Sequence, residues 1–206
     1  MKAFIPAAVA ALALACATTA FAQATKAPAK SASANAPVQS TLKKAPARDG
    51  SHDFDPIVGT WKAKLKRLKH PLSGSDEWVE FEGTQLTRKI WDGRGTMDEF
   101  HVDSPETGTK IDGLTLRLYN PDTGQWHIYW SNAKNGKLDE KPVVGEWKDG
   151  VGEFYDQEYF DGRAIFVRYR WYDVTPTSAK FVQSYSADGG KTWEANWISS
   201  IERVKE

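Results

Sequence analysis

The stretch Thr60-Trp61-Lys62-Ala63-Lys64-Leu65-Lys66 alternates apolar and basic residues after its first position. Successive side chains of a β-strand point to opposite faces, so the tryptophan, alanine and leucine lie together and the lysines lie on the other face. This stretch therefore predicts a strand with one face in the core and one face in water.

The next apolar segment, residues 77–83, alternates in the same way and carries Glu80 and Glu82 on the face opposite Val79 and Phe81. Antiparallel pairing of the two segments places these acids opposite the lysines. Each such cross-strand pair contributes about 0.2–1 kcal/mol, which favours this register. We therefore interpret the basic run 62–69 as a neutralised outer face and not as a polyanion site.

Further alternating segments follow at intervals of about 10–15 residues, separated by turns rich in Gly, Asp, Asn and Pro. The additional strands are expected at residues 96–102, 111–119, 125–132, 143–147, 151–159, 163–172, 180–186 and 192–203. In the second of these, Leu114, Leu116 and Leu118 are in phase. Lys148-Asp149-Gly150 and Asp161-Gly162 are typical of tight hairpin turns.

About ten strands in up-and-down order leave two edges unless the sheet closes, and closure is the usual solution for a long antiparallel meander. The fold class predicted is thus all-β, an antiparallel up-and-down β-barrel of about ten strands. A barrel of this size encloses a cavity unless aromatic side chains fill it. A two-sheet sandwich is the competing architecture.

The chain ahead of these strands has two parts. Residues 1–22, with the apolar run 3–15 and the small residues of Ala20-Phe21-Ala22, are expected to be a secretory signal peptide cleaved after Ala22. Cleavage before Cys16, with lipidation of this cysteine, is a minor alternative. Residues 23–50 are rich in Ala, Pro, Ser and Lys and predict a disordered linker. The barrel domain then comprises residues 51–206, and the expected location is periplasmic or secreted.

Composition limits the partners. All nine tryptophans lie between Trp61 and Trp197, so the core belongs to the barrel domain. The chain has 27 basic and 27 acidic residues, and loss of Lys2 with the signal leaves 26 against 27, a net charge of −1. This balance does not favour nucleic acid as a partner. No apolar segment reaches the roughly 20 residues that a spanning helix needs. The oligomeric state is left open.

Gly59-Thr60-Trp61, at the start of the meander, resembles the Gly-x-Trp opening of calycin-type barrels, a class that includes lipocalins, fatty-acid-binding proteins and nitrobindin-like proteins. The layout over residues 54–203 is similar to theirs, as in uncharacterised secreted bacterial proteins of this type. The resemblance implies that Trp61 closes one barrel end beside Arg203. In nitrobindin-like proteins a late histidine holds haem, but the last two strands here contain none, which leaves His127 as the one strand-borne candidate. We expect no cofactor and no metal site.

The octapeptide SADGGKTW, residues 186–193, matches the Asp-box turn of sialidases and other secreted β-proteins. Asp188 is expected to accept backbone hydrogen bonds, Gly189 and Gly190 to adopt positive φ, and Trp193 to cover the turn. All these roles are structural, so the motif does not predict a glycan enzyme.

The function predicted is binding of a small apolar or amphipathic molecule inside the barrel. The candidate ligand-binding residues are Arg88, Tyr129, Trp130, Gln157, Arg168 and Tyr185. A second hypothesis is an enzyme, a hydrolase or lyase, that uses Asp156 or Glu158 beside Arg168. If the arginines at 168 and 170 meet these acids on the outer face, which we favour, they form a surface ladder instead. A third hypothesis is a carbohydrate-binding surface built from Trp78, Trp91 or Trp126.

Overall fold

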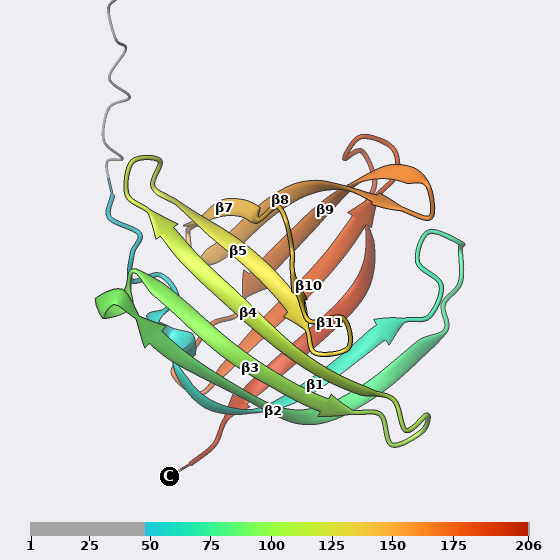
Figure 1. The fold of residues 1–206 in the computed structure, drawn as a ribbon, viewed down its shortest axis with the longest axis horizontal. Helices are drawn as coiled ribbons and strands as arrows, with labels where there is room; N and C mark the ends of the chain where they lie inside the picture. The colour runs from blue at the N-terminus through green and yellow to red at the C-terminus, as the bar shows by residue number, and fades with distance from the viewer. Residues whose placement is uncertain (1–47, 206) are drawn as a thin grey trace, which may run out of the picture. The chain divides into compact units, whose positions relative to one another are not determined.

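The computed structural model describes residues 48–205, in which ten antiparallel strands form one closed ring (Figure 1). The strands are β1 (Gly59–Leu68), β2 (Trp78–Ile90), β3 (Gly95–Asp103), β4 (Lys110–Asn120), β5 (Gln125–Asn132), β7 (Val143–Lys148), β8 (Val151–Phe160), β9 (Arg163–Tyr172), β10 (Ser178–Ser186) and β11 (Glu194–Arg203). Each strand pairs with its neighbours in the chain, β5 pairs with β7, and β1 pairs with β11. The closed ring confirms the barrel and excludes the sandwich.

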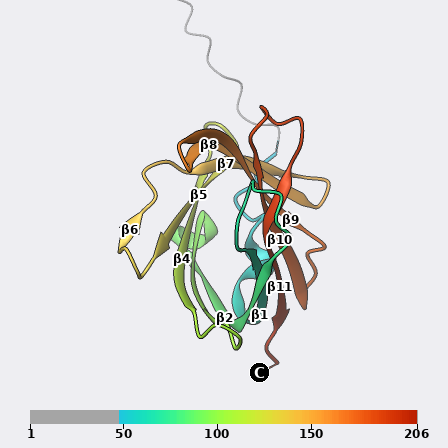
Figure 2. The same ribbon diagram turned by 90° about the vertical axis from the view of Figure 1, so that its right-hand side faces the viewer.

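An eleventh strand that the sequence did not predict, β6 (Lys137–Leu138), pairs with the end of β5 and stands away from the ring (Figure 2). The predicted signal peptide, Cys16 and residues 23–47 of the predicted linker lie outside the described residues. Within residues 48–205, no helix is long and apolar enough to cross a membrane.

The pairing of β1 with β2 confirms the predicted register. Lys64 faces Glu82 and Lys66 faces Glu80. The tight turns are confirmed as well, because Asp149 and Gly150 have φ of 51° and 79°, and Asp161 and Gly162 have φ of 47° and 74°. Two successive positive φ angles are what a type I′ hairpin turn requires.

The inner face of β4 does not carry its leucines. The buried residues alternate through Ile111, Gly113, Thr115 and Arg117, so Leu114, Leu116 and Leu118 lie half-buried on the outer face. The regular leucine spacing identifies a strand, but spacing alone does not say which face is inside. A threonine and an arginine on the inner face indicate a polar site in the barrel.

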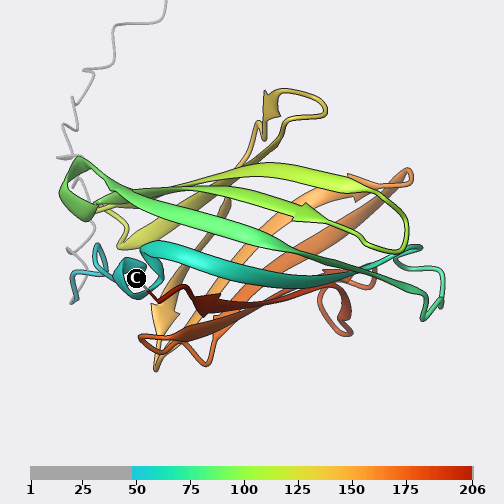
Figure 3. The same ribbon diagram turned by 90° about the horizontal axis from the view of Figure 1, so that it is seen from below.

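One end of the barrel is closed by residues that precede β1. The short 3-10 helix η1 (Asp55–Ile57) lies at this end, and the β1–β2 loop lies at the opposite end (Figure 3). Phe54 is fully buried, with its ring centroid 4.9 Å from that of Trp126 and 5.7 Å from that of Phe154. Trp126 Nε1 also donates to the carbonyl oxygen of Gly50 at 3.0 Å. We call residues 50–57 the plug.

Trp61 and Arg203 fasten the plug to the barrel, as the calycin resemblance implied. Trp61 Nε1 donates to the carbonyl oxygen of Ile57 at 2.8 Å, and the guanidinium carbon of Arg203 lies 4.1 Å from the centroid of the indole. Arg203 Nη1 and Nη2 donate to the carbonyl oxygens of Val58 and Pro56 at 2.8 and 2.7 Å. These bonds satisfy backbone acceptors just before the first strand.

The SADGGKTW turn between β10 and β11 has the predicted structural roles. Asp188 Oδ1 accepts from the backbone N–H groups of Lys191 and Thr192, each at 3.0 Å. Gly189 and Gly190 have φ of 77° and 86°. Trp193 Nε1 donates to the carbonyl oxygen of Gly190 at 3.1 Å, which holds the indole over the turn. The Thr192 hydroxyl also donates to Asp188 Oδ2 at 2.7 Å, and this bond, followed by the backbone bond from Thr192, lowers the pKa of Asp188 because it favours the charged carboxylate.

Candidate functional site: a cavity inside the barrel

A cavity of about 700 Å³ lies inside the barrel, in the part away from the plug. This volume falls within the roughly 300–1,000 Å³ range of small-molecule sites. Its mouth is formed by the β1–β2 end of the barrel, where Arg67, Lys69 and Pro71 lie, and by Glu158 and Phe160 near the β8–β9 turn. The barrel is therefore filled at one end and hollow toward the other.

Aromatic and polar side chains share the walls of the cavity. Nine aromatic side chains line it: Phe81, Phe100, Trp130, Phe160, Tyr169, Trp171, Phe181, Tyr185 and Trp197. Phe100, Trp130 and Trp197 form a triangle with ring centroids 6.0–6.4 Å apart, and they come from β3, β5 and β11. These rings offer an apolar surface suited to a flat or hydrophobic guest.

Gly113 gives Trp130 its position. A Cβ atom at Gly113 would lie 2.0 Å from the Trp130 ring, so only a glycine lets this indole lie against strand β4. Trp130 is half-buried and stays partly open to the cavity. Gly113 thus leaves the space in which the Trp130 indole lies and forms one wall of the cavity.

The floor of the cavity holds a buried ion pair. Arg117 Nη2 lies 2.7 Å from Asp98 Oδ2, and the two side chains are 3% and 2% exposed. Gln85 Nε2 donates to the same oxygen at 3.2 Å, and the backbone N–H of Thr115 donates to Asp98 Oδ1 at 3.2 Å. Arg117, Gln85 and the Thr115 N–H thus satisfy the buried Asp98 carboxylate, which would be strongly destabilising without partners.

The guanidinium of Arg117 also contacts the aromatic core. Its central carbon lies 5.1 Å from the ring centroid of Phe54 and 5.5 Å from that of Trp171. Its Nε and Nη1 atoms are buried and have no hydrogen-bond partner among residues 48–205. Arg117 thus joins the plug, through Phe54, to the floor of the cavity.

Acidic and phenolic groups lie toward the mouth. Loss of solvent raises the pKa of the Glu158 carboxyl, and the nearby charges of Asp156 and Asp139 raise it further. Burial likewise raises the pKa of Asp139, although its carboxylate accepts a hydrogen bond from the backbone N–H of Trp130 at 3.3 Å. Burial also raises the pKa of Tyr185 to about 12, so this hydroxyl stays protonated and available as a donor at neutral pH.

Two of the six predicted ligand-binding residues, Trp130 and Tyr185, line the cavity. The other four do not. Arg88 lies outside the barrel, where its Nη1 is 2.8 Å from Glu99 Oε1. Tyr129 on β5 and Gln157 on β8 point to the outer face, because the residues on either side of each point inward.

Arg168, the remaining candidate, lies on the outer face of β9, with its guanidinium carbon 4.4 Å from the centroid of Trp193. It faces Tyr155 across the hairpin, and its neighbour Arg170 faces Glu153, at 3.3 Å between Nε and Oε1. The arginines point outward as expected, but the predicted pairing with Asp156 and Glu158 is wrong.

Glu153 and Tyr155 lie on the outer face of β8, whereas Asp156 and Glu158 lie on its inner face. Glu158 lines the cavity. The two-residue turn Asp161-Gly162 pairs Phe160 with Arg163, and this register sets the acids opposite Val167 and Ile165. The hydrolase or lyase hypothesis required Arg168 beside these acids, and the barrel wall separates them.

The structure also places residues of the carbohydrate-binding and haem hypotheses where they do not serve those roles. Trp126 is fully buried against the plug and offers no carbohydrate surface, although Trp91 is 64% exposed. Trp78 is half-buried, with Lys66 Nζ 5.0 Å from its ring centroid. His127 is not among the residues that line the cavity. In the described part of the chain, no group of three His, Cys, Asp or Glu residues is placed to hold a metal ion.

Sequence reasoning missed Arg67, Asp98, Arg117, Gln183 and Asn196, all of which line the cavity. Arg67 carried a usable signal, because it continues the phase of Trp61, Ala63 and Leu65 along β1. Asp98 and Gln183 carried a similar signal, because Asp98 is in phase with Phe100 on β3 and Gln183 is in phase with Phe181 on β10. The spacing of Arg117 and Asn196 does not identify them as inner residues.

No protein-family profile matches the sequence, and no curated protein matches it. Solved structures do match. The barrel is similar to an S-type phycobiliprotein lyase from Guillardia theta, with a TM-score of 0.53 and 14% identity over 78% of this chain and 95% of the lyase. A redesigned β-barrel bound to DFHBI matches with a TM-score of 0.41 and 11% identity, over 76% of this chain and all of that one. At these identities the similarity shows the fold alone.

Proposed function

We propose that the protein binds a small apolar or amphipathic molecule inside the barrel. The observation that carries this proposal is the cavity of about 700 Å³ that nine aromatic side chains line together with polar groups. Trp130 contributes an apolar wall, and Tyr185 contributes a hydrogen-bond donor near the mouth. The similarity to the lyase supports the barrel architecture, and no substrate is carried over from it.

Export belongs to the same proposal. Residues 1–22 carry the pattern of a signal peptide, and we place the barrel in the periplasm or outside the cell. A binding protein there meets its ligand outside the cytoplasm. Detection of the mature chain, starting at Gln23, in a periplasmic or secreted fraction would test this part independently.

The binding proposal is tested with N-phenyl-1-naphthylamine, a neutral aromatic probe whose fluorescence rises in apolar surroundings. The purified protein is titrated with the probe beside two variants. Ser199→Phe adds a ring at a buried position that lines the cavity, whereas Ser200→Phe adds the same ring at the exposed neighbouring position. Circular dichroism of each variant establishes that the barrel is folded.

The proposal predicts saturable binding by the unmodified protein. Affinity should fall at least about tenfold in Ser199→Phe because the added ring occupies the guest's space, and it should stay within about twofold in Ser200→Phe. Absence of saturable binding, or equal loss in both variants, would contradict a ligand site inside the barrel.

A further inference from the structure

The cationic side chains that line the cavity differ in whether they are neutralised. Arg117 lies 2.7 Å from Asp98, and Lys69 Nζ lies 3.5 Å from Glu77 Oε2. Arg67 lines the same cavity and has no carboxylate oxygen within 4.0 Å among residues 48–205. The cavity therefore presents one guanidinium whose charge is not balanced by a contacting acid.

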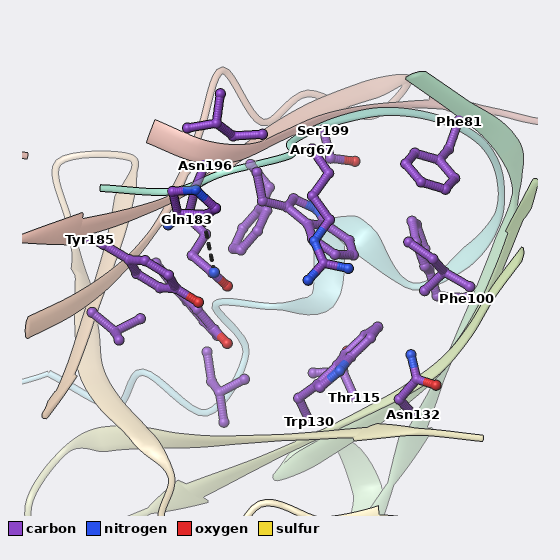
Figure 4. A pocket seen from close by; sticks show the side chains of 18 of the residues that line it. Arg67, Phe81, Phe100, Thr115, Trp130, Asn132, Gln183, Tyr185, Asn196 and Ser199 are labelled. Atoms are coloured by element: carbon purple, nitrogen blue, oxygen red, sulfur yellow. Dashed lines mark hydrogen bonds between the residues drawn. The ribbon is translucent and has the colours of Figure 1, made fainter. Parts of the chain in front are cut away.

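Neighbouring strands hold Arg67 on the inner side. Arg67 is exposed near the end of β1, and it faces Trp197 on β11 and Val79 on β2, both of which line the cavity. Its guanidinium carbon lies 6.0 Å from the ring centroid of Trp197. Figure 4 shows the side chain reaching into the pocket toward Trp130. A guanidinium beside an indole face keeps its in-plane N–H groups free to bind an acceptor.

The wall beside Arg67 supplies neutral hydrogen-bonding groups. Asn196 directly precedes Trp197, and its Oδ1 accepts from Gln183 Nε2 at 2.9 Å, the bond drawn in Figure 4. Asn196 is 3% exposed, and its Nδ2 is a buried donor without a partner among residues 48–205. Tyr185 lines the cavity on the same side as this amide pair. The wall beside Arg67 thus carries one donor, Asn196 Nδ2, that no residue from 48 to 205 pairs with.

We propose that the ligand carries an anionic group, a carboxylate, sulfonate or phosphate, and that Arg67 binds this group while the apolar body lies among Phe100, Trp130 and Trp197. The inference rests on the binding function proposed above and names the chemical class of its ligand. Glu158 and Asp139 also line the cavity and repel an anion, so the acidic group is directed toward Arg67.

The test uses two probes that differ by one charged group. N-phenyl-1-naphthylamine is neutral, and 1-anilinonaphthalene-8-sulfonate adds a sulfonate to the same ring system. Both are titrated into the unmodified protein, into Arg67→Gln and into Lys66→Gln. The second variant is the matched control, because it removes the same charge from the neighbouring residue, which lies on the outer face beside Trp78.

The proposal predicts that Arg67→Gln weakens binding of the sulfonate probe about tenfold and changes binding of the neutral probe less than about twofold. Lys66→Gln should leave both affinities within about twofold. Added salt should weaken sulfonate binding to the unmodified protein more than to Arg67→Gln, since the charge pair is screened.

Three results separate the possible failures. Parallel weakening of both probes in Arg67→Gln would mean that Arg67 only packs against Trp197, and it would overturn the anion site. Unchanged sulfonate binding in Arg67→Gln, or equal loss in Lys66→Gln, would also overturn it while leaving the cavity function intact. Failure of the neutral probe to bind the unmodified protein would instead overturn the proposed function.

Discussion

The plugged end and the open end of this barrel are built from the same ten strands but filled in opposite ways. At the plugged end, Phe54 and Trp126 are fully buried, and Arg203 donates to backbone carbonyl groups. At the open end, Arg67 has no contacting acid among residues 48–205, and the pKa of Glu158 is raised. The indole N–H groups and the Arg203 guanidinium at the plugged end bond to backbone carbonyl groups, whereas the Arg67 guanidinium at the open end is left for solvent or a guest.

The difference shows how one barrel is both stable and hollow: the plugged end is packed with fully buried side chains, and the open end holds the cavity. Large-to-small changes at the packed end remove buried apolar area and leave voids, which are among the most destabilising substitutions. Side chains at the open end are partly exposed already, so changes there have a smaller effect on folding. We therefore expect substitutions at the two ends to separate loss of stability from loss of binding.

The largest expected effect is the loss of stability when the buried Asp98–Arg117 ion pair, which joins the two ends, is broken. Asp98→Ala should lower the free energy of unfolding by about 3–5 kcal/mol, because it leaves the Arg117 charge buried without its carboxylate. Glu99→Ala, at the residue next to Asp98, breaks an exposed ion pair with Arg88 and should have a much smaller effect, because solvent screens that pair. Urea denaturation measures both. Similar losses in the two variants would show that the buried pair does not anchor the floor of the cavity.

Trp130→Ala should affect binding more than stability. It removes one of three rings in the aromatic triangle, and we expect affinity for N-phenyl-1-naphthylamine to fall about tenfold. Trp91→Ala is the matched control, since Trp91 is 64% exposed and does not line the cavity. Fluorescence titration compares them, and an equal loss in both variants would count against the cavity as the binding site.

Acidification should strengthen binding of the sulfonate probe at the open end. As the pH falls from 7 through the raised pKa values of Glu158 and Asp139, both acids become neutral and stop repelling the sulfonate, which stays ionised. Tyr185, which also lines the cavity, stays neutral over this interval because burial raises its pKa to about 12.

Glu158→Gln should raise the affinity for this probe about two- to fivefold at pH 7 and flatten its pH dependence. The same raised pKa means that the ionised Glu158 disfavours folding above the folded-state pKa, an effect that fades as the pH falls from that value to the unfolded-state pKa. Titrations at several pH values check this, and affinity that falls on acidification would contradict it.

The smallest effect on binding is expected at the SADGGKTW turn. Asp188→Ala should lower the thermal unfolding midpoint because the side chain bonds to Lys191 and Thr192, and it should leave probe affinity unchanged. The lowered pKa of Asp188 gives stability above the unfolded pKa that is lost as the pH falls toward the folded value. A large affinity loss in a folded variant would assign the turn a binding role.

The strands were predictable because alternation and turn residues are local. The ten expected segments match the ring strands, and the Lys64–Glu82 pair follows from simple antiparallel alignment. The closing role of Trp61 with Arg203 was available only through the resemblance to calycin-type barrels, since residues so far apart in the chain carry no local signal for their contact.

The site was harder to predict because alternation defines two faces without naming the inner one. On β4 the apolar leucines point outward, while Thr115 and Arg117 point inward toward Asp98. A core rule that places apolar residues inside fails where the interior is itself a polar, partly hollow site. The expected pairing of Asp156 with Arg168 failed because the two-residue turn Asp161-Gly162 fixes the register and places Asp156 opposite Val167.

The central claim is that the barrel is hollow beyond its plug and admits a guest among Phe100, Trp130 and Trp197. The most direct measurement is a crystal structure of the protein grown with a bromine-labelled N-phenyl-1-naphthylamine. The account predicts an anomalous bromine peak within the aromatic triangle. Peaks confined to the outer surface, or an interior filled by the protein's own side chains, would contradict it.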